Sequence, residues 1–358
     1  MAKPDYAFKT TSHSWYPTGR DGVYRARPGG AEIALSLERQ EVPHALLEPG
    51  LKRAVTAWVI ARGGRTLHLN GRKESVSPRQ LDRPPTAPVR RLVSIAPSNA
   101  EIVGALGAVG LLVGVESSSD FPPEIRRLPR LGPDLHVDME ALSTLRPDLV
   151  LASLTVPGME RNLAGLDVLG VPVLVLAPGS IAEIEADVLR VGEAIGHADQ
   201  ARRAVDRMEA DLRSLREARE ARAPVRVFLQ WWHNPMFSPA RACWTNELIE
   251  HAGGVNVFRD LPGQSAQVGP EAVVAADPEV IFISWCGVPF GRLNAARVLR
   301  RKDLGAVTAI REGRVYALDE ALLGRPGPRV VQGVARMAEY IRGVSDGRTR
   351  RRPDAEHA

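Results

Sequence analysis

Histidine and cysteine are the residue types in this chain best suited to metal or nucleophilic chemistry. Among eight histidines and two cysteines, His136, His233, Cys243 and Cys286 come close after predicted strands. A neutral imidazole is a common metal ligand, and a thiolate is both a ligand and a nucleophile. No CxxC or HxxxH spacing accompanies them, and isolated residues of these types are more often surface or packing residues. The pattern therefore favours no metal ion held by protein ligands, and a disulfide between the two cysteines stays open.

Serine and glycine residues near strand ends are candidates for catalysis and nucleotide binding. Ser98 and Ser153 end predicted strands, but neither lies in a G-x-S-x-G elbow. Gly104, Gly107 and Gly110 follow a strand without forming G-x-G-x-x-G or G-x-x-x-x-G-K-[ST]. The sequence predicts no catalytic residue and no nucleotide site.

Two glutamates occupy matching places in an internal repeat. Glu140 begins EALSTLRPDLVLAS, and Glu271 begins EAVVAADPEVIFIS 131 residues later. Each glutamate starts a short predicted helix, where a negative charge is favourable, and each copy ends in a buried strand. Two carboxylates at equivalent places suit a partner with two matching subunits, although each also suits its helix without a partner.

The elements around these residues alternate between strand and helix. In the first half, apolar runs at 93–96, 112–115, 149–152 and 173–176 are separated by helical stretches, which is typical of a parallel sheet. The second half repeats this order. Residues 181–223 contain no proline and place apolar residues three and four apart, which predicts helices that break at Gly196 and resume from Ala198 to about Ala221. The predicted fold is α/β, with two pseudo-symmetric lobes on parallel sheets joined by a long backbone helix.

Proline, glycine and charge divide the chain further. Turn signals between short apolar runs predict a small β-rich extension at the N-terminus, and four prolines in a polar stretch predict a linker. The expected parts are the N-terminal extension, the linker, the first lobe, the interlobe helices, the second lobe and a polar tail, at residues 1–70, 71–89, 90–179, 180–223, 224–345 and 346–358.

The net charge of +5 is unevenly distributed. Residues 1–90 hold 15 Lys and Arg against 8 Asp and Glu, whereas the body from 91 to 345 carries a net charge of −3. A nucleic-acid function for the body gains no support. No apolar stretch reaches the roughly 18 residues that a membrane span needs, and no signal peptide is visible at the N-terminus.

Several segments together resemble a known family. They are RLVSIAPSNAEI from Arg91, SDFPP from Ser119, PDLV from Pro147, RVFLQ from Arg226 with the following Asn234-Pro235, GGVNVF from Gly253 and RPGPR from Arg325. In order and spacing they are similar to the cobalamin-binding branch of the helical-backbone (class III) periplasmic binding proteins, over residues 90 to 342. Such proteins deliver vitamin B12, iron siderophores or haem to ATP-binding-cassette importers.

The resemblance implies a ligand between the lobes, at the carboxyl ends of the strands. The residues that it places there are Ser98, Asn99, Asp120, Phe121, Asp134, His136, Ser153, Trp231, Trp232, His233, Phe237, Trp285, Cys286, Asp319 and Glu320. Aromatic side chains suit a corrin or porphyrin, since a flat apolar ring can stack on them. Asp134 and Ser153 stand where cobalamin binders carry tryptophan, so a corrinoid, haem and a ferric siderophore all stay open, with His136 or His233 as axial ligand.

The same resemblance gives the paired glutamates a function. It implies that Glu140 and Glu271 dock onto arginine pockets of two permease subunits. The chain is then a monomeric, non-enzymatic substrate-binding protein without an intrinsic cofactor. Two alternatives are a cytosolic protein that handles corrinoids or metal chelates and a metal-dependent enzyme on the same fold. The family implies a periplasmic or cell-surface location, while the missing signal leaves a cytoplasmic one open.

Overall fold

The computed structural model describes residues 8–9, 14–17, 23–26, 33–36, 41–42, 49–61, 64, 66–69, 72–218 and 223–345. The chain forms two compact units. The first unit comprises Met1–Ala177 and Arg190–Ala198, and the second comprises Pro178–Leu189 and Asp199–Ala358. No helix in the described ranges is long and apolar enough to span a bilayer.

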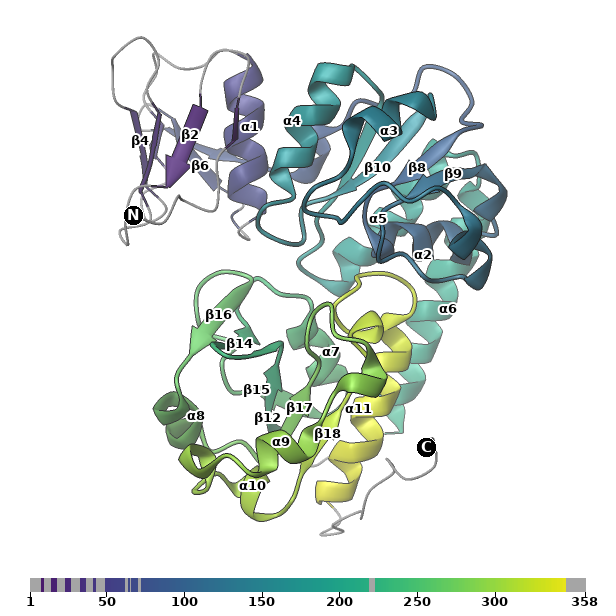
Figure 1. The fold of residues 1–358 in the computed structure, drawn as a ribbon. Coiled ribbons are helices and arrows are strands. Elements are labelled where there is room, and N and C mark those ends of the chain that lie inside the picture. Colours follow the sequence, from purple (N-terminus) through teal and green to yellow (C-terminus); the bar gives the residue numbers. More distant parts are fainter. Residues whose placement is uncertain are drawn as a thin grey trace. The chain divides into compact units, whose positions relative to one another are not determined.

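A four-stranded parallel sheet forms the centre of the first unit (Figure 1). Its order is β11-β10-β8-β9, with strands β8 (Leu92–Ser94), β9 (Leu112–Val115), β10 (Leu149–Ser153) and β11 (Val173–Leu176). Nearly every residue of these strands is buried. Continuous apolar runs are what a parallel sheet covered on both faces requires, so the strands were visible in the sequence.

Helices surround the first sheet. The helical elements along residues 97–194 are α2 (Pro97–Ala105), η3 (Val109–Leu111), η4 (Pro123–Arg127), α3 (Met139–Thr144), α4 (Glu160–Leu169) and α5 (Ile181–Ala194), the last of which runs through both units. Val93 and Val150 of the sheet belong to a single apolar cluster. Leu142 of α3 joins this cluster, as do Leu163 and Leu166 of α4.

The second unit repeats this arrangement. Its parallel sheet has the order β15-β12-β17-β18, with strands β12 (Val225–Gln230), β15 (Gly254–Asn256), β17 (Val280–Ile283) and β18 (Val315–Ala317). Alternate residues of each strand face opposite sides, so Val227 and Phe282 join one apolar cluster while Phe228 and Ile281 join another. The sheet is therefore buried on both faces.

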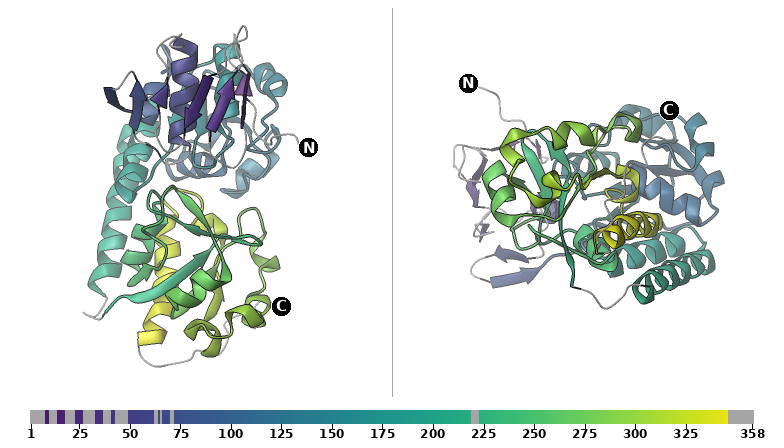
Figure 2. Two further views of the ribbon diagram at one scale, coloured as in Figure 1. Left: turned by 90° about the vertical axis from the view of Figure 1, so that its left-hand side faces the viewer. Right: turned by 90° about the horizontal axis from the view of Figure 1, so that it is seen from below.

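Helices α7 (Thr245–His251) and α11 (Val330–Ser345) contribute to the cluster on one face, and α8 (Pro270–Ala276), α9 (Ala295–Leu299) and α10 (Thr308–Arg311) contribute to the other. Figure 2 shows α11, in yellow, running along the sheet. The remaining elements of this half are a small antiparallel sheet and short 3-10 turns, namely β13 (Trp232–His233), β14 (Met236–Pro239), β16 (Ser265–Val268), η5 (Phe290–Arg292), η6 (Lys302–Leu304) and η7 (Glu320–Leu322).

The 131-residue repeat is present in the structure as well as in the sequence. Helices α3 and α8 begin 131 residues apart, at Met139 and Pro270, and strands β10 and β17 begin at Leu149 and Val280. Between helix and strand, Arg146 and Asp277 have positive φ values of 44° and 39°, which non-glycine residues rarely adopt. Both lie directly before a proline, which disfavours helical backbone at that position, and the helices end just before it, at Thr144 and Ala276.

The predicted long helix is α6 (Ala198–Glu217). It begins where the sequence predicted, because Gly196 adopts a positive φ of 75° and terminates α5. It ends at Glu217 rather than near Ala221, and residues 219–222 lie outside the described part of the chain.

The N-terminal region contains strands, as its turn signals predicted. Strands β1 (Phe8–Lys9), β2 (Ser14–Pro17), β3 (Val23–Ala26) and β4 (Ile33–Ser36) form an antiparallel sheet. A second sheet follows, with the strands β5 (Glu41–Val42), β6 (Thr66–Leu69) and β7 (Arg72–Ser75). The β-rich extension of the predicted fold is thus confirmed.

Residues 49–83 also complete the core of the first unit, which the prediction of a linker over 71–89 did not anticipate. Trp58 of α1 (Pro49–Ile60) and Leu81 of η2 (Pro78–Leu81) are each 2% exposed or less and belong to the same apolar cluster as β10. Arg83 pairs with Val173 through reciprocal backbone hydrogen bonds of 2.8 Å at the edge of β11. A polar, proline-bearing stretch can hide such contacts because a few apolar side chains suffice to anchor it.

Candidate functional site

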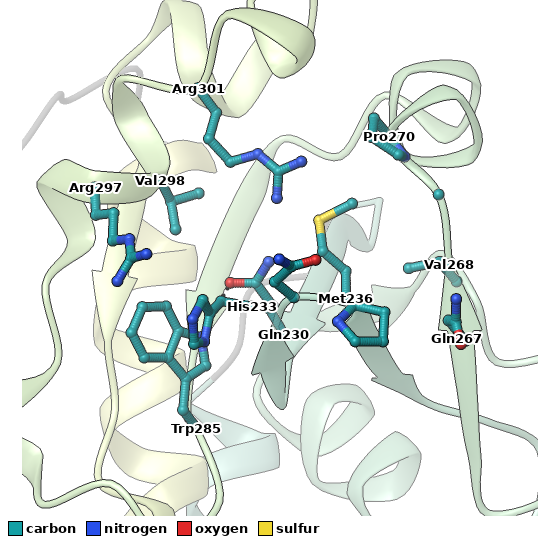
Figure 3. Close-up of a pocket in the computed structure, with 13 residues that line it drawn as sticks. Gln230, His233, Met236, Gln267, Val268, Pro270, Trp285, Arg297, Val298 and Arg301 are labelled. Carbon is teal, nitrogen blue, oxygen red and sulfur yellow. Dashed lines mark hydrogen bonds between the residues drawn. The ribbon is translucent and has the colours of Figure 1, made fainter. Parts of the chain in front are cut away.

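A cavity of about 510 Å³ lies within the second unit. Figure 3 shows that its walls come from the end of β12, the small sheet of β13, β14 and β16, the start of α8, and the segment around α9. Gln230 is the last residue of β12, and Trp285 follows β17 by two residues, so the cavity lies at the carboxyl end of the sheet. Ligands of open α/β sheets bind at this edge.

Hydrogen bonds fix the strand ends that form this wall. Trp285 Nε1 donates to Gln230 Oε1 at 3.0 Å, and the Ser284 amide donates to the Gln230 carbonyl at 3.0 Å. The Cys286 amide donates to the Trp231 carbonyl at 3.1 Å. Trp285 is 4% exposed, so its indole is held rigidly at the edge of the cavity.

Three aromatic rings lie one after another beside the cavity. The His233 ring lies 4.7 Å from Trp285 and 5.0 Å from Trp232, measured between centroids. Trp232 pairs with Phe237 across β13 and β14, remains 37% exposed, and donates from Nε1 to the Asn234 carbonyl at 3.2 Å. The structure thus brings the rings of Trp232, His233 and Trp285 together, and His233 and Trp285 line the cavity.

The surroundings of His233 favour its neutral form. Burial lowers its pKa below the ordinary value, and the positive charges of Arg297 and Arg301 lower the pKa further. Its Nδ1 atom is buried and has no hydrogen-bond partner within the described ranges. A neutral imidazole with an unpaired nitrogen can accept a hydrogen bond or coordinate a metal in a ligand.

The other predicted residues of the second unit lie outside the residues that line the cavity. Trp231 packs against Trp244 at 6.3 Å between ring centroids. Asp319 Oδ1 accepts a hydrogen bond from the Ala321 amide at 3.0 Å, and Glu320 lies 3.7 Å from Arg325. Both acidic side chains therefore have structural partners.

The two cysteines are free thiols, which resolves the open question of a disulfide. Cys243 is 2% exposed, its Sγ lies 2.6 Å from Thr245 Oγ1, and burial raises its thiol pKa to about 12. A thiol with that pKa is a poor nucleophile and metal ligand. Cys286 is exposed. Within the described ranges, no group of three His, Cys, Asp or Glu side chains is arranged to hold a metal ion.

The predicted residues Ser98 and Asn99, in the first turn of α2, and Ser153, at the end of β10, are buried and hydrogen-bonded within the first unit. Asn99 Nδ2 donates to the Ala152 carbonyl at 3.1 Å, and Ser98 Oγ donates to Asn99 Oδ1 at 3.2 Å. Ser153 Oγ lies 2.8 Å from Thr155 Oγ1. All three side chains are less than 5% exposed, so they hold the strand ends in place.

Four predicted residues of the first unit are more accessible. Phe121 is 37% exposed, and Asp120 is exposed beside it. His136 is exposed, with Nε2 at 3.4 Å from Arg161 Nη1. Burial raises the pKa of Asp134, and the nearby Glu116 carboxylate raises the pKa further.

Glu140 and Glu271 are both exposed in the first turns of their helices. The helix starts differ, however. Asp138 caps α3 by accepting from the Ala141 amide at 2.9 Å, whereas α8 starts after Gly269. A Cβ atom on Gly269 would lie 2.7 Å from Glu271 Oε1, so the glutamate folds back over that glycine.

The sequence did not predict four of the residues that line the cavity, namely Gln230, Met236, Arg297 and Arg301. The sequence did contain an indication for Gln230, since a polar residue at the end of an apolar strand commonly faces a ligand site. Arg297 and Arg301 are four residues apart in an arginine-rich stretch that looks like a solvated surface. Only the fold places these two arginines beside His233.

Comparison with known proteins gives a consistent result. The profile of the family described as "Periplasmic binding protein" matches residues 92–322. A vitamin B12-binding protein of Vibrio cholerae serotype O1 is 28% identical over 267 residues, which cover 75% of this chain and 94% of that protein. An uncharacterized ABC transporter substrate-binding lipoprotein, YvrC of Bacillus subtilis, is 29% identical over 258 residues, or 70% of this chain and 80% of that one.

The fold is also similar to solved structures. The periplasmic heme-binding protein RhuT from Roseiflexus sp. RS-1, solved in its apo form, matches with a TM-score of 0.63 and 26% identity. The match covers 72% of this chain and 99% of that one.

Proposed function

Because the chain belongs to the periplasmic binding protein family, we propose that it captures a corrinoid or an iron chelate and delivers it to an ABC importer. Relatives named for vitamin B12, for heme and for ABC transport support this proposal. Delivery of an intact molecule needs no covalent step, so the ligand should be released chemically unchanged.

The observation that carries the proposal is the aromatic wall at the edge of the cavity. Trp285 and His233 present flat faces next to a space of about 510 Å³, within the 300–1,000 Å³ typical of small-molecule sites. A corrin or porphyrin is a large, rigid, largely apolar ring, and burying it stabilises a complex by about 25 cal/mol per Å² before the cost of association. The exposed ring of Trp232 lies next to His233, at 5.0 Å between ring centroids.

His233 is the residue best placed to contact the metal of such a ligand. Its lowered pKa favours the neutral imidazole, and its buried Nδ1 has no hydrogen-bond partner among the described residues, whereas His136 is exposed beside the cationic Arg161. An imidazole ligand to cobalt or iron changes the visible spectrum of the macrocycle. We therefore assign axial ligation to His233.

Glu140 and Glu271 serve as docking residues in this proposal. Both are exposed, and both occupy the same position in the two copies of the repeat. Each carboxylate is available to a guanidinium of a partner, and paired arginine–carboxylate contacts are among the stronger charged hydrogen bonds. A monomer that presents two such groups can engage two permease subunits at once.

Relatives named as periplasmic proteins and as a lipoprotein support a location outside the cytoplasmic membrane. Fractionation of cells that express the full chain tests this placement. Recovery in the cytosol alone would contradict it.

Titration of the purified protein with aquocobalamin, cobinamide and haemin tests the proposed function. Tryptophan quenching reports binding, and chromatography of the released ligand reports its integrity. Saturable binding of at least one macrocycle, recovered unchanged, is expected. Failure of all three to bind, or recovery of an altered ligand, would contradict the proposal.

A further inference from the structure

The polar side chains along the cavity supply mainly hydrogen-bond donors. Arg297 and Arg301 lie on one wall, Gln230 lies at the floor, and no acidic residue is among the thirteen that line the space. Figure 3 shows the Arg301 guanidinium extending toward Gln230 and Met236, with the Arg297 guanidinium above Trp285. Such an arrangement favours a ligand group that carries negative charge.

Gln230 contributes a buried donor that the protein does not use. Its side chain is fully buried, and its Oε1 already accepts from Trp285 Nε1 at 3.0 Å. That bond fixes the orientation of the amide. The Nε2 group is left buried without a hydrogen-bond partner in the described part of the chain. Buried donors are nearly always paired, so this N–H₂ group indicates an acceptor brought by the ligand.

The two arginines differ in how they are held. Arg301 donates from Nε to Asp303 Oδ1 at 3.0 Å and from Nη2 to Asp303 Oδ2 at 2.5 Å, which orients its guanidinium and leaves Nη1 outside this pair. Arg297 is exposed, and its side chain has no ion pair with any described residue. One arginine is thus positioned, and the other supplies an uncompensated positive charge.

We infer that this cavity binds a carboxylate of the ligand, through Gln230 Nε2 and the guanidinium groups of Arg297 and Arg301. The inference rests on the proposed function and narrows its substrate class to chelates that bear carboxylates. This carboxylate belongs either to a side arm of a tetrapyrrole or to a ferric siderophore. Neutral primary amide arms would complement the cavity less well, since they bring donors as well as acceptors.

The pKa of His233 is consistent with this inference. Both arginines lower it, so their positive potential extends to the edge of the space where the ligand would lie.

Ligand pairs that share a macrocycle but carry either carboxylates or neutral ester and amide groups test the inference. Haemin is compared with its dimethyl ester, and cobyrinic acid with cobinamide, while ferric citrate represents a siderophore-type carboxylate. We expect the acid of a matched pair to bind about tenfold or more tightly than its neutral partner, and this preference to fall with rising salt. Ferric citrate binding without either macrocyclic acid would assign the carboxylate to a siderophore.

Variants show whether the preference arises in this cavity. Arg297→Gln should reduce binding of the acid about tenfold and leave the ester unchanged. Arg300→Gln is the matched control, because Arg300 is exposed on the same segment and does not line the cavity. Gln230→Glu keeps the acceptor for Trp285 but replaces the buried donor with a like charge, and should weaken acid binding further.

Equal binding of acid and neutral ligands would overturn the inference while leaving the proposed function intact. An equal loss in Arg297→Gln and Arg300→Gln would overturn it as well, since a general effect of surface charge would then explain the preference. Failure of every ligand to bind would contradict the inference and the proposed function together.

Discussion

The two sheets are alike at their amino ends and different at their carboxyl ends. At the amino ends, the amide of Arg91 donates to Asp148 at 2.8 Å, and the amide of Arg226 donates to Glu279 at 3.0 Å. Both arginines also donate from Nε to a backbone carbonyl at the C-terminal end of a helix, Arg91 to Leu145 after α3 and Arg226 to Asp277 after α8. The same pattern of hydrogen bonds therefore joins a helix and two strands in both units.

At the carboxyl ends the 131-residue offset aligns Ser153, Leu154 and Thr155 with Ser284, Trp285 and Cys286. In the first unit the two hydroxyls pair with each other at 2.8 Å beside a fully buried leucine. In the second unit a tryptophan reaches the edge of a cavity, and Ser284 Oγ is buried without a partner within the described ranges. The two copies of the repeat thus share their helices and strands. Most of the buried polar side-chain atoms that lack a hydrogen-bond partner among the described residues lie in the second unit.

The largest difference should appear when this aligned pair is truncated. Trp285→Ala and Leu154→Ala should each lower the free energy of unfolding, by about 3–5 and 2–5 kcal/mol respectively. Only Trp285→Ala should also abolish macrocycle binding, because it removes the ring that stacks beside His233 and leaves Gln230 Oε1 unpaired. Urea denaturation and ligand titration measure the two effects. Equal loss of binding in both variants would contradict the proposed difference between the carboxyl ends of the two sheets.

The glutamates of the two units should contribute equally to docking on the importer. Glu140→Ala and Glu271→Ala should each weaken transport about tenfold or more in a reconstituted importer, because each leaves a permease arginine without its carboxylate. Ligand affinity should not change. Glu124→Ala, on an exposed part of η4, is the charge-matched control. A loss of ligand binding in either docking variant would place that glutamate in the ligand site instead.

A smaller and symmetric effect is expected at the amino ends. Asp148→Ala and Glu279→Ala should each cost about 1 kcal/mol of unfolding free energy, since the hydrogen bonds that they remove are partly exposed to solvent. Chemical denaturation of the two variants measures this directly. Costs that differ severalfold would show that the two amino ends are not energetically equivalent.

The smallest effects should come from pH, with opposite signs in the two units. The folded pKa of His233 is depressed, so the unfolded chain binds the proton more readily, and stability should fall as the pH drops from about 6.5 through the folded value. The folded pKa of Asp134 is raised, so its contribution falls as the pH rises through its titration. Comparing His233→Gln and Asp134→Asn with the parent protein between pH 4 and 8 isolates the two contributions. A reversed sign in either variant would contradict the corresponding environment.

The fold could be predicted because buried parallel strands are continuous apolar runs and because the repeat shows the same run twice. The aromatic part of the site could be predicted for a related reason, since Trp232, His233 and Trp285 lie at or just after strand ends. Arg297 could not, because an arginine on a short helix looks the same in sequence whether it faces water or a cavity. The packing of Trp58 and Leu81 was also hidden, since their neighbours in the chain are polar or proline.

The burial of Ser98, Asn99 and Ser153 illustrates a further limit. Small polar residues at strand ends are expected in ligand sites, but they are equally suited to pairing with nearby backbone groups. The choice depends on distances such as the 3.1 Å from Asn99 Nδ2 to the Ala152 carbonyl, which the sequence does not encode locally. Three predicted contacts of the first unit therefore hold the strand ends.

Spectral titration of histidine variants shows whether the second unit recognises the metal of the ligand. Aquocobalamin and haemin each have an open axial position, so their visible spectra report imidazole coordination. We expect a saturable spectral shift that is lost in His233→Ala and retained in His136→Ala. A shift that survives in His233→Ala and disappears in His136→Ala would place metal recognition in the first unit and contradict the claim.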